Sequence, residues 1–193
     1  LETALVGQVI SVECLVRHGE VAVLGVNSRC LSKRDPEIEM GSAFPLRLPN
    51  EEQLACYVTA LHQVLAYQHG ASHIELMRLP NGEFELIEFN ARFVGADVLL
   101  AMNRVFDAEI EQDLVKLYVD KLDTLPQYQA TGVSVLQYLL APEGVERFEG
   151  MTCDQPAIEM LKLNVQPGDT LRRSRNQIDQ IGGFLVHAED YAS

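Results

Sequence analysis

The sequence contains few positive charges for its length. Only 15 of its 193 residues are lysine or arginine, against 28 aspartates and glutamates, so the formal net charge is −13. A surface of this sign repels the phosphates of nucleic acids and anionic membranes. We therefore expect neither nucleic acid nor a membrane to be a primary partner.

Long apolar runs and paired cysteines are missing as well, and no signal-peptide pattern is recognised in these residues. No apolar run approaches the length of a membrane span, and the amino terminus lacks the layout of a signal peptide. The four cysteines (Cys14, Cys30, Cys56 and Cys153) form no CxxC pair, which predicts reduced thiols in a cytoplasmic protein rather than a disulfide framework or a zinc site. The chain begins with Leu-Glu-Thr and runs at once into strand-like sequence, which suggests a piece of a longer protein.

The patterns that are present predict an α+β protein. Runs rich in β-branched and aromatic residues alternate with runs of helical periodicity over residues 1–123. Asn50 is expected to cap a helix, with Gln53 in the reciprocal position and Gly70 as its stop. The other expected elements are strands at 7–16, 20–26, 72–79 and 83–90, a loop at 27–49, and helices at 96–105 and 108–122.

The sequence changes character after a linker at 124–130. Short strand-like runs separated by glycine and proline turns follow in residues 131–193, which predicts a small β-rich unit packed on the first domain. The expected strands cover 133–140, 145–148, 158–163, 170–172 and 184–188.

The most informative stretch is a predicted hairpin around residues 81–82. Asn-Gly between two alternating runs is a strong hairpin signal, and a two-residue turn would place Glu75 opposite Glu88 and His73 opposite Asn90. Because side chains alternate along a strand, these four groups share one face. The other face would pair Arg78 with Glu85, Leu76 with Ile87 and Ile74 with Phe89.

Two opposed carboxylates repel each other and destabilise a hairpin unless a cation lies between them. Magnesium prefers oxygen ligands, commonly one or two carboxylates together with substrate phosphates, so Glu75 and Glu88 predict a metal site. Asn90 adds a neutral oxygen, and Arg92 offers a donor fork suited to phosphate. His73 either orients a neighbouring group or contacts substrate, and both roles stay open.

The structural alternative is a solvated sheet face, on which screening makes the repulsion cheap. Against it, the same face is expected to carry apolar residues and to be partly covered. These are Met77, Leu79, Phe84 and Leu86. A slip of one residue in the turn would separate the two carboxylates and remove the argument. We interpret the pair as a metal site.

These residues resemble the ATP-grasp superfamily of carboxylate–amine ligases. In that family, a glutamate on one strand and a Glu-x-Asn-x-Arg motif on the next bind metal and triphosphate; here they are Glu75 and Glu88-x-Asn90-x-Arg92. The resemblance implies ATP and magnesium (or manganese) as cofactors, with Glu75, Glu88 and Asn90 on the metal. Asn90 and Arg92 would contact the nucleotide, and Arg92 would act catalytically on phosphate or an acyl phosphate. Ala91 stands where many members have proline.

The flanking sequence supports the same resemblance. Residues 7–14 resemble the strand after the adenine-binding hinge, so Glu2 would lie in or near the hinge and bind the cofactor. Residues 145–188 resemble the tail of amino-acid ligases. The resemblance implies the carboxyl-terminal subdomain of the ATP-grasp fold, an antiparallel sheet with helices, over 1–123, with the β-rich unit following. A family enzyme also has a substrate domain and a lysine-bearing lid, so we expect this piece to be inactive alone.

Two classes of function follow. The first is an enzyme segment: the parent would activate a carboxylate, for example that of an amino acid, with ATP, and an amine would attack the acyl phosphate to form an amide. Glycinamide ribonucleotide synthetase-like and biotin carboxylase-like enzymes are alternatives within the superfamily, and a homodimer is an allowed assembly. The second class is a non-catalytic interaction module that keeps the scaffold.

Overall fold

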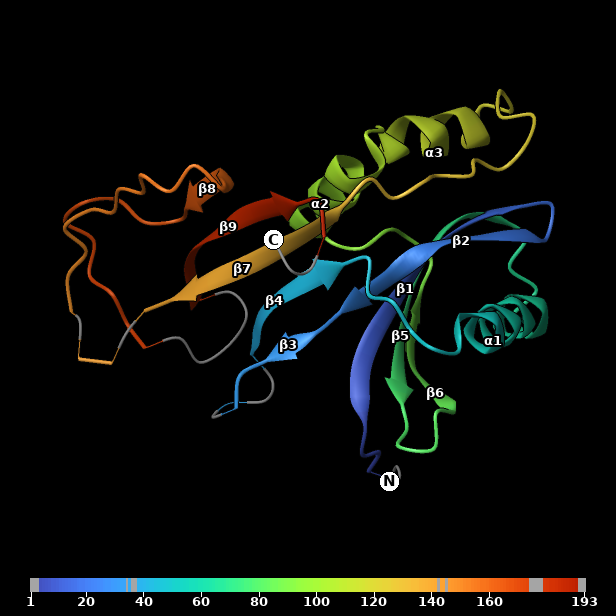
Figure 1. Cartoon of the computed structure of the whole chain (residues 1–193), viewed down its shortest axis with the longest axis horizontal. Coiled ribbons are helices and arrows are strands. Elements are labelled where there is room, and N and C mark those ends of the chain that lie inside the picture. Colours follow the sequence, from blue (N-terminus) through green and yellow to red (C-terminus); the bar gives the residue numbers. More distant parts are fainter. Residues whose placement is uncertain are drawn as a thin grey trace.

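The structure is a computed structural model in which residues 4–33, 35, 38–141, 143–144, 146–173 and 179–190 are described. Its strands form two antiparallel sheets, in the orders β2-β1-β5-β6 and β3-β4-β7-β9-β8, and helices pack against them (Figure 1). The fold is therefore α+β, as predicted. In chain order the elements are β1 (Gln8–Arg17), β2 (Glu20–Ser28), β3 (Cys30–Leu31), β4 (Glu39–Phe44), α1 (Glu51–Val64), β5 (His69–Arg78), β6 (Phe84–Asn90), α2 (Ala96–Phe106), α3 (Ile110–Tyr118), β7 (Val133–Leu140), β8 (Ile158–Leu163) and β9 (Gln180–Ala188).

The four-stranded sheet is covered on one face by α1. Ile10 and Val12 of β1 and Ile74 of β5 belong to one buried cluster with Leu54 and Val58 of the helix. Full burial of each such side chain contributes about 1.5–3 kcal/mol, so this face forms a core of the first sheet. Among the described residues, no helix is both long enough and apolar enough to cross a membrane.

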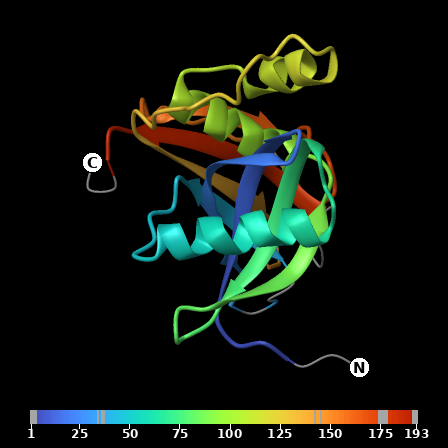
Figure 2. The ribbon, with the colours of Figure 1, turned by 90° about the vertical axis from the view of Figure 1, so that its right-hand side faces the viewer.

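The five-stranded sheet takes strands from both ends of the chain. The segment 27–49, expected to be a loop, contributes β3 and β4, and β4 pairs with β7. On this sheet, Val98 and Ala101 of α2 pack with Leu136 and Leu185, and Figure 2 shows the two sheets from the side. The linker at 124–130 therefore separates strands that share one sheet, and the proposed division into two domains stays a prediction.

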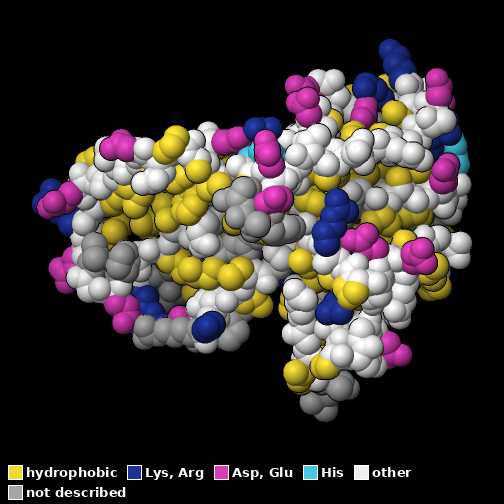
Figure 3. Space-filling view, viewed as in Figure 1, with side chains coloured by type: hydrophobic (Ala, Val, Ile, Leu, Met, Phe, Trp, Pro, Cys, Tyr) yellow, Lys and Arg dark blue, Asp and Glu magenta, His cyan; other side chains and the backbone are white. Residues whose placement is uncertain are grey.

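The segment between β7 and β9 contains irregular chain where short strands were expected. Where strands were predicted at 145–148 and 170–172, the described residues form one isolated bridge, between Arg147 and Thr170. Val145 lies outside the described residues. Phe148, Leu171 and Ile181 form a small cluster there. In Figure 3, hydrophobic side chains gather on this side of the molecule, over β7, β8 and β9.

The turn of the hairpin β5–β6 differs from the prediction. The amide of Leu79 donates to the carbonyl of Glu83 at 2.8 Å, and the amide of Gly82 donates to the carbonyl of Leu79 at 2.9 Å. Gly82 has φ 87°, the left-handed conformation that favours glycine. The loop therefore has three residues, 80–82, and the predicted two-residue turn is wrong.

A register shift further along the hairpin compensates for the longer turn. It lies between Glu75 and Leu76 on β5, so that Leu76 pairs with Leu86 while Glu75 pairs with Glu88, as predicted. The β6 residue Ile87 is the extra one at this irregularity, so the predicted Leu76–Ile87 pair is wrong. The predicted pair of Arg78 with Glu85 is wrong for the same reason.

The shift also changes which side chains cover the two glutamates. Phe84 lies opposite Arg78 and packs in the α1-side cluster with Leu76, not on the glutamate face. Leu86, opposite Leu76, also moves to that side of the hairpin. The prediction that Phe84 and Leu86 share a face with the carboxylates is therefore wrong.

Three local predictions about helix ends are also wrong. The helix α3 is shorter than expected and ends at Tyr118, shortly before Asp120 turns left-handed at φ 55°. The helix α1 ends at Val64, and Gly70 lies in β5 rather than at the helix stop. The third concerns Asn50, which directly precedes α1 as predicted but makes no side-chain capping hydrogen bond. Its amide nitrogen donates instead to the carbonyl of Gly82 at 2.7 Å and so ties the helix to the hairpin loop.

Candidate functional site

The face of the four-stranded sheet opposite α1 carries two rows of polar side chains. The first row crosses β2, β1, β5 and β6 as Asn27, Ser11, Glu75 and Glu88. The second row crosses β1, β5 and β6 as Glu13, His73 and Asn90. Because alternate residues of each strand point to opposite faces, the apolar residues between these positions supply the α1 core while the polar ones gather here.

Five charged side chains follow one another across this face with alternating sign. The buried carboxylate of Glu13 accepts from Nδ1 of His73 at 2.6 Å, and Nε2 of the same ring lies 3.3 Å from Oε1 of Glu75. Arg29 donates from Nη1 to that same Oε1 at 2.6 Å. Nε of Arg29 lies 2.9 Å from Oε1 of Glu39. Each charge is thus neutralised by its neighbours.

The neighbours also determine the ionisation of these groups. Burial disfavours a charged imidazole, but the hydrogen bonds and charges of Glu13 and Glu75 raise the pKa of His73 to about 9. The hydrogen bond from His73, with further help from Arg29, outweighs burial and lowers the pKa of Glu75 to about 2. Burial raises the pKa of Glu39 despite the neighbouring guanidinium. At neutral pH, His73 is therefore an imidazolium and Glu75 a carboxylate.

Glu13 was not predicted as a site residue, although it is the most deeply buried of the group. Its side chain is fully buried, and Oε2 accepts from the backbone amide of Val94 at 3.1 Å while Oε1 lies 3.4 Å from Nδ2 of Asn27. The contact with Val94 fixes the segment that joins β6 to α2. The signal was present in β1, where Ser11 and Glu13 alternate with apolar residues and so must face a polar layer.

A cavity of about 240 Å³ lies above the polar face. It is lined by residues of β1, β2, β4, β5, β7 and α2 and of the segments that follow β2 and β6, among them Arg29, Glu39, His73, Glu75, Arg92 and Tyr138. Burial, reinforced by nearby carboxylates, raises the pKa of Tyr138 to about 12, so its hydroxyl is a neutral donor at physiological pH. The cavity therefore combines guanidinium, imidazolium and hydroxyl donors beside a carboxylate pair.

The structure brings most of the predicted site residues together. Glu75 lies opposite Glu88 and His73 opposite Asn90, as the hairpin pattern predicted. His73 has a carboxylate at both ring nitrogens, which favours the orienting role over substrate contact. Arg92 is exposed at the cavity, where Nη1 donates to the carbonyl of Phe93 at 2.8 Å. The predicted cofactor contact at Glu2 lies outside the described residues.

The donor set on the hairpin fits a magnesium ion that is shared with phosphate. Both contacts of Glu75 use Oε1, and its Oε2 makes no hydrogen bond to the described residues. Glu88 is exposed, and the side-chain nitrogen of Asn90 is buried without a hydrogen-bond partner in the described part of the chain, which shows that no protein group fixes this amide. Two carboxylates and an amide oxygen are ligands typical of magnesium.

The described residues do not form a complete metal cage by themselves. No cluster of three or more histidine, cysteine, aspartate or glutamate side chains within them is arranged to hold a metal ion. Magnesium usually retains waters and takes its remaining ligands from substrate phosphates, so an open set is expected for a nucleotide-linked site. The individual ligand and nucleotide assignments stay predictions.

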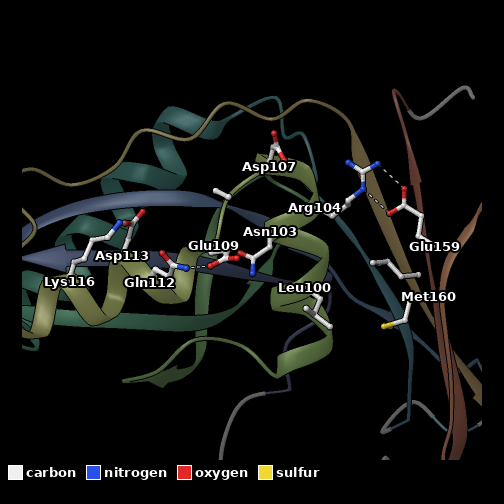
Figure 4. Close-up of a pocket in the computed structure, with 12 residues that line it drawn as sticks. Leu100, Asn103, Arg104, Asp107, Glu109, Gln112, Asp113, Lys116, Glu159 and Met160 are labelled. Carbon is white, nitrogen blue, oxygen red and sulfur yellow. Dashed lines mark hydrogen bonds and ion pairs between the residues drawn. The ribbon is translucent and has the colours of Figure 1, made fainter.

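A larger hollow, of about 750 Å³, lies elsewhere, between the helices α2 and α3 and the strand β8 (Figure 4). Four of its charged groups form ion pairs. Arg104 makes two hydrogen bonds with Glu159, at 2.7 and 2.8 Å, and Lys116 lies 2.6 Å from Asp113. None of the site residues predicted from the sequence lines this hollow.

Comparisons with known proteins place the fold. No protein-family model matches the chain, and no curated protein sequence matches it. Among solved structures, a phosphoribosylglycinamide synthetase from Anaerococcus prevotii matches 98% of the chain with a TM-score of 0.82 and 15% identity. An L-amino acid ligase from Bacillus licheniformis matches 98% with a TM-score of 0.80 and 20% identity. A biotin carboxylase from Campylobacter jejuni, in a beta-gamma-ATP complex, matches 98% of the chain with a TM-score of 0.69 and 18% identity.

The chain has the fold of these ATP-grasp structures. This confirms the resemblance at the level of the fold, including the antiparallel sheet with helices. The chain spans 50% of the length of the first two ATP-grasp structures and 44% of the third. At these identities the likeness concerns the fold alone, so substrate and activity have to be argued from the site.

Proposed function

We propose that the chain supplies the metal- and phosphate-binding wall of an ATP- and magnesium-dependent carboxylate–amine ligase. The observation that carries the proposal is the pairing of Glu75 with Glu88 on an ATP-grasp scaffold, beside a cavity lined by Arg29 and Arg92. In this proposal the chain corresponds to the carboxyl-terminal half of the longer ATP-grasp proteins, and the remaining nucleotide contacts come from the other half.

The residues divide the work as follows. Glu75, Glu88 and Asn90 would hold magnesium, which when bound neutralises charge on the transferring phosphoryl group. Arg92 would contact that phosphoryl group and then the acyl phosphate. His73 would orient Glu75, since its imidazolium contacts the carboxylate at 3.3 Å.

The overall reaction forms one amide bond. A substrate carboxylate oxygen attacks the γ-phosphorus of ATP, which gives an acyl phosphate and releases ADP. An amine then attacks the acyl carbon, phosphate leaves, and the amine loses a proton. Holding the carboxylate, the triphosphate and the amine in place supplies much of the acceleration. An amino acid is a carboxylate of suitable size, and ATP, a carboxylate and an amine are the proposed partners.

One observation favours the non-catalytic alternative. The ion pair between Arg29 and Glu75 removes part of the repulsion between Glu75 and Glu88 without a metal, so the hairpin is stable as a scaffold. Metal binding discriminates between the two functions, because an interaction module has no need of it.

The first experiment measures binding of Mn²⁺, as a paramagnetic substitute for Mg²⁺, to the 193-residue chain. Backbone amide signals of His73 and Asn90 should broaden at low Mn²⁺ concentrations. The variant Glu88→Gln should weaken binding about tenfold or more, since it loses a charged ligand, whereas Glu85→Gln on the same exposed strand is the matched control and should not. Broadening at another acidic cluster alone would contradict the assignment.

The second experiment concerns catalysis in a longer protein that contains this chain. Glu88→Gln should lower ligase turnover by orders of magnitude and leave the metal-free melting temperature nearly unchanged, because the side chain is exposed. Normal turnover with normal magnesium dependence would show that Glu88 is not a ligand. The prediction that the 193 residues alone lack ligase activity is checked by ADP release in the presence of both a carboxylate and an amine.

A further inference from the structure

The guanidinium of Arg29 lies between two carboxylates and uses a different nitrogen for each. Nε lies 2.9 Å from Oε1 of Glu39, and Nη1 lies 2.6 Å from Oε1 of Glu75. The side chain is 19% exposed, so both ion pairs are largely shielded from solvent. Because the two ion pairs use different nitrogens, the loss of one carboxylate does not by itself remove the other.

The contact with Glu75 conflicts with metal binding at the same carboxylate. Arg29 and His73 both direct positive charge at Oε1 of Glu75, from 2.6 and 3.3 Å. A divalent cation at Glu75 would stand next to a guanidinium already at hydrogen-bond distance, and like charges at such separations repel strongly where water is largely excluded. A cation that takes Oε1 of Glu75, alone or together with the open Oε2, would therefore replace the contact with Arg29.

We infer that Arg29 neutralises the charge of Glu75 in the metal-free chain and is displaced from Glu75 when a divalent cation binds. Arg29 then stays paired with Glu39. This inference rests on the proposed function, because it takes Glu75 as a metal ligand. Arg29 lines the same cavity as Arg92 and Tyr138, so the released nitrogens face a space that already contains phosphate-type donors. Metal binding thus makes a second guanidinium available to an anionic ligand.

The test compares the affinity for Mn²⁺, measured by electron paramagnetic resonance, of the wild-type 193-residue chain and of Arg29→Gln. If Arg29 competes with the metal, Arg29→Gln should bind Mn²⁺ about tenfold or more tightly, the size expected for removing a like charge at contact distance. Arg104→Gln, which removes the same charge from an exposed ion pair far from the hairpin, is the matched control and should stay within about twofold. Equal or weaker binding by Arg29→Gln would overturn the inference.

The double variant Arg29→Gln with Glu39→Gln separates competition at Glu75 from a simple change in net charge. It has the same formal charge as the wild type and cannot recruit Glu39 as a new ligand. A persistent gain in Mn²⁺ affinity supports displacement at Glu75, and complete loss of the gain overturns it.

If these variants fold poorly, a measurement on the wild type still tests the inference. During a Mg²⁺ titration, the Nη signals of Arg29 in nitrogen-15 NMR should shift as the contact with Glu75 breaks, while the Nε–H signal keeps the chemical shift of its pair with Glu39. Nη signals that stay constant at saturating Mg²⁺ would overturn the inference.

Glu75→Gln distinguishes failure of this inference from failure of the proposed function. If Glu75→Gln abolishes Mn²⁺ binding but Arg29→Gln leaves it unchanged, the metal site stands and the role of Arg29 is wrong. If neither the wild type nor Arg29→Gln binds Mn²⁺ at the hairpin, both proposals fail.

Discussion

Removal of the charge of Glu13 should destabilise the chain more than any surface substitution. The carboxylate is fully buried and accepts from Nδ1 of His73 at 2.6 Å and from the amide of Val94 at 3.1 Å. Glu13→Gln keeps the size of the side chain and one carbonyl oxygen. The principal change is the loss of the negative charge that faces the imidazolium.

The magnitude follows from the two partners of His73. A hydrogen bond to a charged group contributes about 1.5–3 kcal/mol, whereas removal of one member of an isolated buried ion pair costs about 3–5 kcal/mol. His73 retains Glu75 at 3.3 Å, so its charge is not left uncompensated and the lower range applies. For a chain of this size, about 1.5–3 kcal/mol corresponds to a melting temperature lower by roughly 3–12 °C.

Thermal melting at pH 7, followed by circular dichroism, measures this shift. Glu149→Gln, in an exposed loop, is the matched control and should change the free energy of unfolding by no more than about 0.5 kcal/mol. Hydrogen exchange at the amide of Val94 should also accelerate in Glu13→Gln. If Glu13→Gln melts with the wild type, the alternating charges are not stabilising and the argument from their burial is refuted.

Three further predictions concern other parts of the fold. Burial lowers the pKa of His62 below its usual 6.5, so the unfolded chain binds the extra proton more readily, and His62 should reduce stability as the pH drops from 6.5 to 5, by at most about 1.4 kcal/mol per pH unit. Urea unfolding of the wild type and of His62→Gln measures this contribution as the difference between the two slopes, because the opposite contribution of His73, whose folded pKa is raised to about 9, is common to both chains. Gly41→Ala should destabilise by about 1–3 kcal/mol in the same assay, since a Cβ there would lie 2.2 Å from the carbonyl oxygen of Leu136, and an unchanged midpoint would refute the steric argument. A thiol reagent should label the three exposed cysteines of the native chain, and it should label Cys14, whose pKa is raised by burial, only after unfolding. Mass spectrometry counts the labels, and four labels on the native chain would contradict the burial of Cys14.

The hairpin shows what a sequence pattern can predict and where it stops. Alternation and the Asn-Gly signal identified the pairing of Glu75 with Glu88, which the structure confirms. The prediction relied on a two-residue turn, whereas the chain has a three-residue loop and a compensating irregularity between Glu75 and Leu76. Irregularities of this kind depend on how both strands twist against the rest of the sheet, and residue types alone do not encode them.

The ion pairs of the site could not be predicted from local sequence patterns, for a different reason. Arg29 and Glu39 lie in a segment that reads as a loop, since its two strands are short and irregular in sequence. Arg29 meets Glu75 across a separation of 46 residues. Arg29 directly follows β2, and the strand order β2-β1-β5 brings it close to Glu75, so the contact depends on the tertiary fold. Glu13 differs, because its alternation with apolar neighbours along β1 indicates a polar layer on this face of the sheet.

In the metal site proposed above, the two glutamates of the hairpin would make unequal contributions. Glu88 is exposed and has no charged partner among the described residues, so a cation can reach it without breaking a protein contact. Glu75 is held by His73 and Arg29, and its pKa of about 2 shows how strongly these cations favour its charged form. A divalent cation should therefore meet Glu88 first and gain Glu75 only as Arg29 leaves. In this order, the affinity of the site for metal is set by the competition at Glu75, not by the number of carboxylates on the hairpin.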